Sequence, residues 1–207
     1  MRFGFNSLHF TMNIDTAGLL DSAAFIPSPN CDERPEGTMI SLLVIHYISL
    51  PPDQFSGGDV IRLFTNRLDF DSHPTYESLK GVKVSTHFFI RRDGTLIQFV
   101  PCGKRAWHAG VSNWQGRERC NNFSIGIELE GNGTVPFTDT QYAALIELTQ
   151  CLRAHYPIEH IAGHSDIAPG RKTDPGPCFD WQRYAINVNC GDLFRAAGHA
   201  AVDHEKP

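Results

Sequence analysis

The sequence has little that would direct the protein to a membrane or to nucleic acid. No run of about 18 apolar residues occurs in its 207 residues, so no transmembrane helix is expected. The opening residues lack the unbroken apolar stretch and the small-residue cleavage site of a secretory signal, and we therefore expect a cytoplasmic protein. The net charge of -5 argues against a general attraction to phosphate backbones or anionic lipid. A small-molecule substrate and a monomeric state are the expectations that remain.

Closely spaced cysteine pairs are also absent. The six cysteines are scattered without any CxxC spacing, which argues against a cysteine-built zinc site or a dense disulfide framework. We expect reduced thiols, with Cys102, Cys120 and Cys151 acting as small buried hydrophobic residues. The proportion of hydrophobic residues, 41%, is that of a folded globular chain, and the length suits a single domain.

The apolar patterns predict an α/β fold that begins after a long lead-in. The first 38 residues read as this lead-in, because the segment 25–38 is too rich in proline, glycine and charge for a regular element. The continuous apolar run over 39–50 predicts a central strand that is covered on both faces. Apolar residues at helical spacing over 60–68 predict that a helix follows this strand.

Further elements follow from turn and capping signals. The Asp93-Gly94 dipeptide predicts a hairpin within 84–100. A period of two over 123–131 predicts a strand with two glutamates on one face. A helix should begin at the Thr138 cap and stop at Pro157, a short strand should cover 159–163, and a last helix should follow an Asp180 cap.

Three residues that are distant in the sequence form a candidate hydrolytic metal set. His164 and Asp174 lie in the segment 163–176, where prolines and glycines prevent a long helix or strand. His46 ends the predicted central strand, and open α/β sheets place their sites beyond the carboxyl ends of strands. Two imidazoles and one carboxylate leave a fourth zinc position free for water. The same set also holds ferrous iron in oxygenases, and a loop histidine is often simply exposed.

Three strings carry a resemblance to a known family. They are SLLVIHYISLPP, RAWHAGVSNWQGRERCNNFSIGIELEG and RKTDPGP, and they resemble the zinc N-acetylmuramoyl-L-alanine amidases, a family that includes phage amidases and peptidoglycan recognition proteins. The resemblance, which covers about residues 25–184, implies a single domain with a central mixed β-sheet flanked by helices and a zinc cleft. We place a lead-in at 1–24, the zinc amidase domain at 25–190 and a C-terminal tail at 191–207.

The resemblance also implies an activity. It is closest to members that hydrolyse the amide bond between 1,6-anhydro-N-acetylmuramic acid and L-alanine of muropeptides during peptidoglycan recycling. Two other functions are weighed against it: an amidase that acts on intact peptidoglycan outside the cytoplasm, and a sugar-peptide binding module that has lost catalysis. Tyr47 and Gly170 depart from residues common in the family, where an asparagine and an acidic residue are frequent.

The residue roles implied by the resemblance fit amide hydrolysis. The implied Zn2+ ligands are His46, His164 and Asp174. Glu128 would be the catalytic carboxylate, which takes a proton from water and returns one to the leaving amine. Lys172 would stabilise the developing oxyanion. Two alternatives stay open, since Glu128 and Glu130 could form a solvated strand face, and Lys172 could be a surface partner of Asp174.

Substrate recognition is expected on the segment 105–120, which is irregular and dense in aromatic and basic groups. The substrate-binding residues that the resemblance favours are Trp107, His108 and Arg119. Trp114 could equally be a packing residue. His87 matches a recurrent family position, and it is read either as structural or as a substrate contact.

Overall fold

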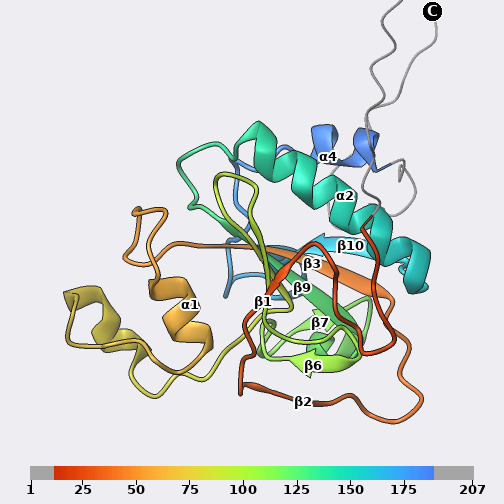
Figure 1. The fold of residues 1–207 in the computed structure, drawn as a ribbon, viewed down its shortest axis with the longest axis horizontal. Helices are drawn as coiled ribbons and strands as arrows, with labels where there is room; N and C mark the ends of the chain where they lie inside the picture. The colour runs from red at the N-terminus through yellow and green to blue at the C-terminus, as the bar shows by residue number, and fades with distance from the viewer. Residues whose placement is uncertain (1–11, 189–207) are drawn as a thin grey trace, which may run out of the picture.

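The computed structural model describes residues 12–188 and contains a six-stranded mixed sheet (Figure 1). In spatial order the strands are β1 (Ala24–Phe25), β5 (Leu96–Gln98), β4 (Phe88–Ile90), β9 (Ser124–Glu130), β3 (Leu42–Ile48) and β10 (His160–Gly163). The β4–β5 pair is antiparallel, whereas β4, β9, β3 and β10 run parallel to one another and β1 runs parallel to β5. The single-domain mixed sheet expected from the sequence is confirmed.

One face of the sheet is covered by α2 (Asp139–His155) and α4 (Trp181–Asn187), which lie together in Figure 1. The main hydrophobic cluster joins these helices to the sheet residues Leu43, Ile45 and Ile127. Leu43 and Ile45 are fully buried, as is Ile127. The continuous apolar run over 39–50 therefore forms a central strand, as predicted, because both of its faces are removed from water.

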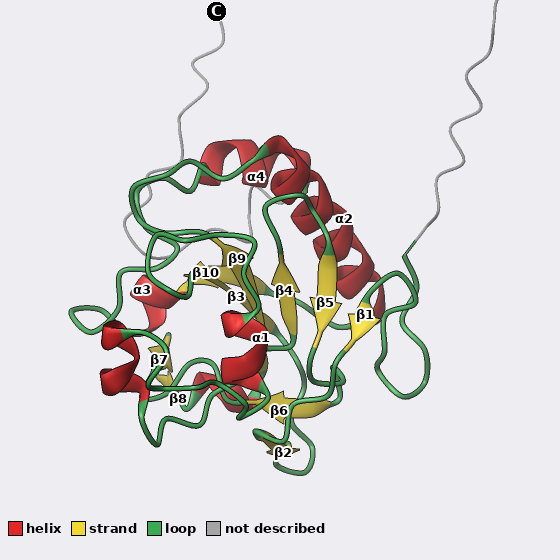
Figure 2. Ribbon diagram, turned by 60° about the vertical axis from the view of Figure 1, so that its left-hand side comes forward, coloured by secondary structure: helices red, strands yellow, loops and turns green. Residues whose placement is uncertain are grey.

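The opposite face of the sheet carries α1 (Asp59–Phe64), the 3-10 turns η1 (Pro74–Leu79) and η2 (Cys120–Asn122), and the small hairpin of β7 (Asn113–Trp114) and β8 (Arg117–Glu118). In Figure 2, α1 lies in front of the sheet while α2 and α4 arch over its other side. Two further hydrophobic clusters hold this layer, one around Phe89 with α1 and one around Val44 with Trp114. The two clusters flank a polar centre.

The predicted caps and turns are confirmed. Thr138 and Gln141 form a reciprocal capping box at the start of α2, and Asp180 accepts a hydrogen bond from the backbone N–H of Arg183 at the start of α4. Gly94 adopts a φ of 86° in the β4–β5 turn, a left-handed conformation that glycine takes without steric cost. The helix expected over 60–68 is shorter: α1 ends at Phe64, and Asn66 adopts a left-handed φ of 57° that cannot continue a right-handed helix.

The lead-in prediction was wrong for part of its length. The segment 25–38 contains β2 (Cys31–Glu33), which pairs antiparallel with β6 (Lys104–Ala106). Ile14 and Leu20 belong to the main hydrophobic cluster. Local composition could not indicate these contacts, because they depend on partners about 70 or more residues away in the sequence. Residues 1–11 and the expected tail 191–207 lie outside the described residues.

The remaining global expectations concern thiols and membrane spans. Cys102, Cys120 and Cys151 are buried free thiols, as predicted, and Cys190 lies outside the described residues. Within residues 12–188, none of the helices combines the length and the apolar character that crossing a bilayer requires.

Candidate metal centre and active site

The register of three parallel strands builds one row of polar side chains. His46 on β3 is the direct cross-strand partner of Glu128 on β9. Gly163, at the end of β10, pairs with Ile45, so His164 follows at the level of His46. His46 and Glu128 are far apart in the sequence, yet the sheet makes them neighbours near the carboxyl ends of the strands.

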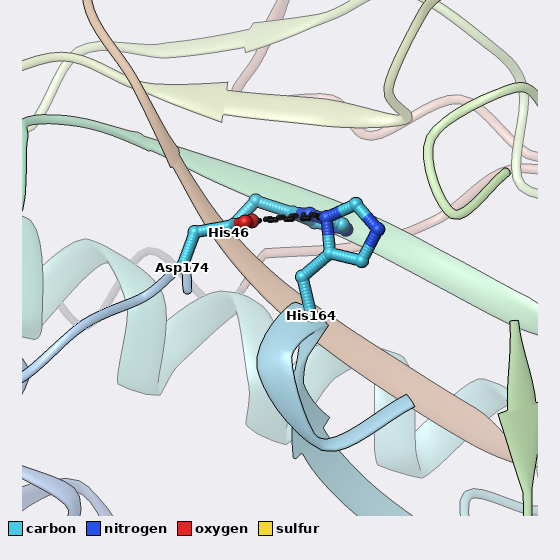
Figure 3. Close-up of side chains that lie close together, drawn as sticks. All are labelled: His46, His164 and Asp174. Carbon is cyan, nitrogen blue, oxygen red and sulfur yellow. Dashed lines mark hydrogen bonds and ion pairs between the residues drawn. The ribbon is translucent and has the colours of Figure 1, made fainter. Parts of the chain in front are cut away.

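The structure brings His46, His164 and Asp174 together in the buried cluster of Figure 3. Nδ1 of His46 lies 2.9 Å from Nδ1 of His164 and 2.9 Å from Oδ2 of Asp174, and the third side of the triangle is 3.1 Å. A tetrahedral zinc with bonds of about 2.0–2.1 Å would hold its ligand atoms about 3.4 Å apart. The three atoms therefore fit a divalent metal after a small outward movement.

A tight reversal of the chain delivers Asp174. His164 opens the single-turn helix α3 (His164–Ile167), and the backbone N–H of Ser165 donates to the carbonyl of Asp174 at 2.8 Å. A side chain at Gly163 would place its Cβ 2.6 Å from Cδ of Pro175, so only glycine permits this approach. The loop geometry thus explains how one short segment supplies two of the three candidate ligand atoms.

The outer nitrogens of both histidines have partners of their own. Nε2 of His164 donates to the carbonyl of Ala109 at 3.1 Å, which leaves its Nδ1 lone pair free. Nε2 of His46 lies 3.0 Å from Nδ1 of His108, whose Nε2 lies 3.1 Å from the hydroxyl of Ser124. The Ser124 hydroxyl donates in turn to the carbonyl of Cys120 at 2.6 Å. With Nδ1 of His46 serving as a ligand, every group in this chain has a consistent donor or acceptor role.

The charge states of His46 and Asp174 favour the binding of a cation. Burial lowers the pKa of His46 to about 4, so its imidazole is neutral at pH 7 and offers a lone pair. Burial by itself would raise the pKa of Asp174, but the close contacts of its carboxylate with His164 and His46 outweigh burial and hold that pKa well below its ordinary value. The site therefore presents the lone pair of neutral His46 and the negative oxygen of Asp174 beside Nδ1 of His164.

The two glutamates of β9 differ in their surroundings, which resolves the alternative of a solvated face. Glu130 is 2% exposed, and its carboxylate accepts the backbone N–H groups of Ser56 and Arg92. Glu128 is 8% exposed, and its Oε2 is buried without a hydrogen-bond partner within residues 12–188. Burial, with the nearby charge of Asp174, raises the pKa of Glu128 well above its ordinary value. Backbone amides therefore satisfy the carboxylate of Glu130, whereas Glu128 stays the candidate for chemistry.

Lys172 is exposed at the edge of the cluster. The ion pairs of Asp174 in the described part of the chain join it to His46 and His164, and none joins it to Lys172. The positive charge of Lys172 opposes the rise in the pKa of Glu128. Its charge also lowers the pKa of His46, so it acts on two residues of the cluster through the electrostatic field and not through an ion pair.

The three residues predicted to bind substrate lie in different environments. Trp107 is half-buried, and hydrogen bonds from Arg105 and Trp107 lower the pKa of Asp32. His108 is 8% exposed and lies behind His46. Arg119 is exposed in the turn after β8, with a φ of 58°. Their contact with substrate stays a prediction, and His108 has an additional contact with a ligand histidine that the sequence did not suggest.

Two open interpretations are decided by burial. Trp114 is 7% exposed and packs in the cluster that contains Val44, so it is a packing residue. His87 is fully buried, and its Nδ1 accepts the backbone N–H of Gly126. The substrate-contact reading of His87 is therefore wrong.

Gly126 is a site residue that sequence reasoning missed, although a glycine inside a strand often marks a close approach. A Cβ at this position would lie 2.5 Å from Cγ and 2.7 Å from Nδ1 of His108. We expect Gly126→Ala to displace His108 from His46, lowering both activity and the melting temperature, with overpacking costing about 1–3 kcal/mol. Gly103→Ala is the control, because a Cβ there meets nothing within 4 Å. Equal melting temperatures and rates for the two variants would contradict this expectation.

The fold and the site together define an α/β protein with a potential three-ligand metal centre beside a buried carboxyl group, one oxygen of which has no hydrogen-bond partner within residues 12–188. The comparisons with known proteins then specify the family. The family model described as N-acetylmuramoyl-L-alanine amidase matches residues 36–177. The chain belongs to this family of N-acetylmuramoyl-L-alanine amidases.

Individual relatives agree with this assignment. The 1,6-anhydro-N-acetylmuramyl-L-alanine amidase AmpD of Enterobacter cloacae is 55% identical over 169 residues, which is 81% of this chain and 90% of the relative. The crystal structure of a selenomethionine derivative of AmpD superimposes with a TM-score of 0.83 at 52% identity, covering 86% of this chain and 99% of the other.

A more distant structure includes a ligand. It is the Escherichia coli amidase AmiD in complex with anhydro-N-acetylmuramic acid-L-Ala-D-gamma-Glu-L-Lys, named there as its substrate. It is 33% identical, with a TM-score of 0.53, and covers 86% of this chain and 65% of the other.

Proposed function

We propose that this protein is a zinc-dependent amidase that hydrolyses the amide bond between 1,6-anhydro-N-acetylmuramic acid and L-alanine in soluble muropeptides. The observation that carries the proposal is the convergence of His46, His164 and Asp174 beside the unpartnered carboxyl group of Glu128. Relatives whose names state this activity, 55% identical in one case, support the choice of substrate. A role in peptidoglycan recycling, the cytoplasmic location and the monomeric state stay predictions.

The three ligand residues would hold the zinc through Nδ1 of His46, Nδ1 of His164 and Oδ2 of Asp174. When bound there, zinc would lower the pKa of a water molecule to about 7 and polarise the scissile carbonyl. Asp174 would supply negative charge, and the two neutral imidazoles would leave a net positive site. Their outer hydrogen bonds to Ala109 and His108 would keep the rings aimed at one point.

Proton transfer would fall to Glu128. Its position opposite His46 on the neighbouring strand places the carboxyl group beside the ligand cluster. In its ionised form Glu128 would accept a proton from the attacking water, and it would then deliver that proton to the departing amine nitrogen. An elevated pKa suits the first step, because it makes the carboxylate a stronger base towards the proton of the water.

Lys172 would add positive charge near the developing oxyanion. We expect Lys172→Met to lower kcat by about 10²-fold with little change in zinc content. Because the lysine charge lowers the pKa of Glu128, its removal should move the acid limb of the pH–rate profile to higher pH. Lys80→Met, which removes an exposed lysine paired with Glu77 and Asp71, is the control. An unchanged rate and profile in Lys172→Met would refute this role.

The decisive test of the proposed function is incubation with a defined anhydromuropeptide, with and without a chelator, followed by mass spectrometry. We expect release of the intact peptide, loss of activity on chelation and recovery with zinc. Elemental analysis separates zinc from iron. Cleavage of purified sacculi alone would point to an enzyme of intact peptidoglycan, and bound but uncleaved muropeptide would point to a binding module; either result would overturn the proposal.

A further inference from the structure

One side chain holds the segment that supports both ligand histidines. Oδ1 of Asn121 accepts the backbone N–H groups of His108 at 3.1 Å and of Ala109 at 2.8 Å. These two residues are the ones that contact the outer nitrogens: His108 through its ring on His46, and Ala109 through its carbonyl on His164. Asn121 is thus connected to His46 through His108 and to His164 through Ala109.

This arrangement has a geometric consequence. A metal-ligating histidine binds well only if its ring direction and tautomer are fixed, and the partner of its outer nitrogen fixes both. If the backbone at His108 and Ala109 shifted, both outer partners would move together, and the two Nδ1 atoms would no longer converge. The position of a two-residue segment therefore controls the geometry of two of the three ligand atoms.

Asn121 is itself firmly held by Arg34, which comes from the N-terminal segment. Nη1 of Arg34 donates to the backbone carbonyls of Asn121 at 3.1 Å and Asn122 at 2.8 Å. Its Nη2 donates to the backbone carbonyls of Ser124 and Cys102. Burial lowers the pKa of Arg34 to about 10, which still leaves it charged at pH 7. A charged donor on backbone carbonyls makes strong hydrogen bonds, so the turn that carries Asn121 is a rigid support.

We propose that Asn121 is a positioning residue of the metal centre, which acts by accepting hydrogen bonds from the backbone of His108 and Ala109 and so orients His46 and His164. This inference rests on the proposed function, because it takes the two histidines as ligands. It adds a residue that touches neither the metal nor the substrate. We therefore expect the loss of the Asn121 side chain to weaken metal binding more than it destabilises the fold.

The test compares zinc affinity among full-length variants, by competition with a chromophoric chelator. Asn121→Ala removes the shared acceptor and should lower zinc affinity by about 10–100-fold. The visible absorption of the Co2+-substituted protein should change in the same variant, because the ligand geometry loosens. Asn121→Asp keeps an acceptor oxygen at the same distance and should restore affinity and spectrum towards those of the unmodified protein.

The matched control is Asn122→Ala, in the same turn, where Oδ1 accepts a hydrogen bond from Arg105 at 2.6 Å. It should keep the original zinc affinity even if its melting temperature falls. If Asn121→Ala does not fold, Asn121→Ser, whose hydroxyl is too short for both N–H groups, replaces it. Unaltered affinity in the Asn121 variant, or an equal loss in Asn122→Ala, would overturn the inference alone. An unmodified protein that neither binds zinc nor cleaves the muropeptide would overturn the proposed function as well.

Discussion

Replacement of Glu128 by glutamine should reduce kcat by about 10²–10⁴-fold while the protein still binds zinc. Glutamine has nearly the same shape but cannot take up or release a proton at this position. The three ligand atoms belong to other residues, so the metal centre should stay assembled. The measurement is the rate of release of peptide from anhydromuropeptide, together with the zinc content of the purified variant.

The same substitution should change stability in the metal-free protein, with a sign set by the raised pKa of Glu128. Below its ordinary pKa of 4.5 the carboxyl group is neutral in both folded and unfolded chains, so burial costs least there. As the pH rises above that value, the unfolded chain releases the proton while the folded chain retains it, and the folded state loses stability. The melting temperature of Glu128→Gln should therefore rise relative to the original protein as the pH increases from 4.5 upwards.

Glu130→Gln is the control for the loss of kcat and for the pH dependence of the melting temperature. Its carboxylate accepts two backbone N–H groups, from Ser56 and Arg92, so the substitution should weaken a structural contact and leave the chemistry in place. A loss of kcat in Glu130→Gln as large as that in Glu128→Gln would contradict the assignment of Glu128. So would a Glu128→Gln variant with full activity.

Replacement of Asp174 by asparagine should abolish activity by removing the metal. The carboxylate is the one negative group among the three candidate ligands, and its contacts with His46 and His164 lower its pKa and so favour the charged form. A neutral amide oxygen is a much poorer ligand for zinc, and the two imidazoles alone do not make a structural or catalytic zinc set. We expect at least about a 10³-fold fall in rate, a scale typical of a lost group that stabilises the transition state. Zinc content after dialysis should fall in parallel.

Asp180→Asn provides the comparison for Asp174. Asp180 accepts a hydrogen bond from the backbone N–H of Arg183 at the start of α4, where asparagine is an equally good cap. Its zinc content and rate should match those of the original protein. Retention of stoichiometric zinc by Asp174→Asn would show that the three-ligand assignment is incorrect.

Local patterns predicted several elements, and residue types singled out the candidate reactive residues. The apolar run over 39–50, the Thr138 capping box and the Asp93-Gly94 turn each depend on neighbours within a few residues, and all three are present in the structure. His46, His164 and Asp174 were singled out by residue type and resemblance, and the structure brings them together.

Other features depend on partners that no local pattern contains. The strand at Cys31–Glu33 exists because it pairs with Lys104–Ala106, so its proline-rich surroundings gave no signal. The distinction between Glu128 and Glu130 also came from tertiary contacts, since backbone amides satisfy one carboxylate and leave the other unpartnered. The contact of His108 with His46 likewise depends on Gly126, because a side chain at that position would overlap the ring of His108.

The sequence by itself indicated which side chains could perform metal-assisted hydrolysis and which of the strongly patterned segments would become strands and helices, because these depend on residue chemistry and short-range periodicity. Only the tertiary structure decided how those side chains share a site. Strand register sets His46 opposite Glu128, and the reversal after β10 turns Asp174 back onto His164. The support of both ligand rings by the segment at His108 and Ala109 was decided in the same way. The physical reason is that register and loop closure are set by burial of the whole sheet, which no single segment encodes.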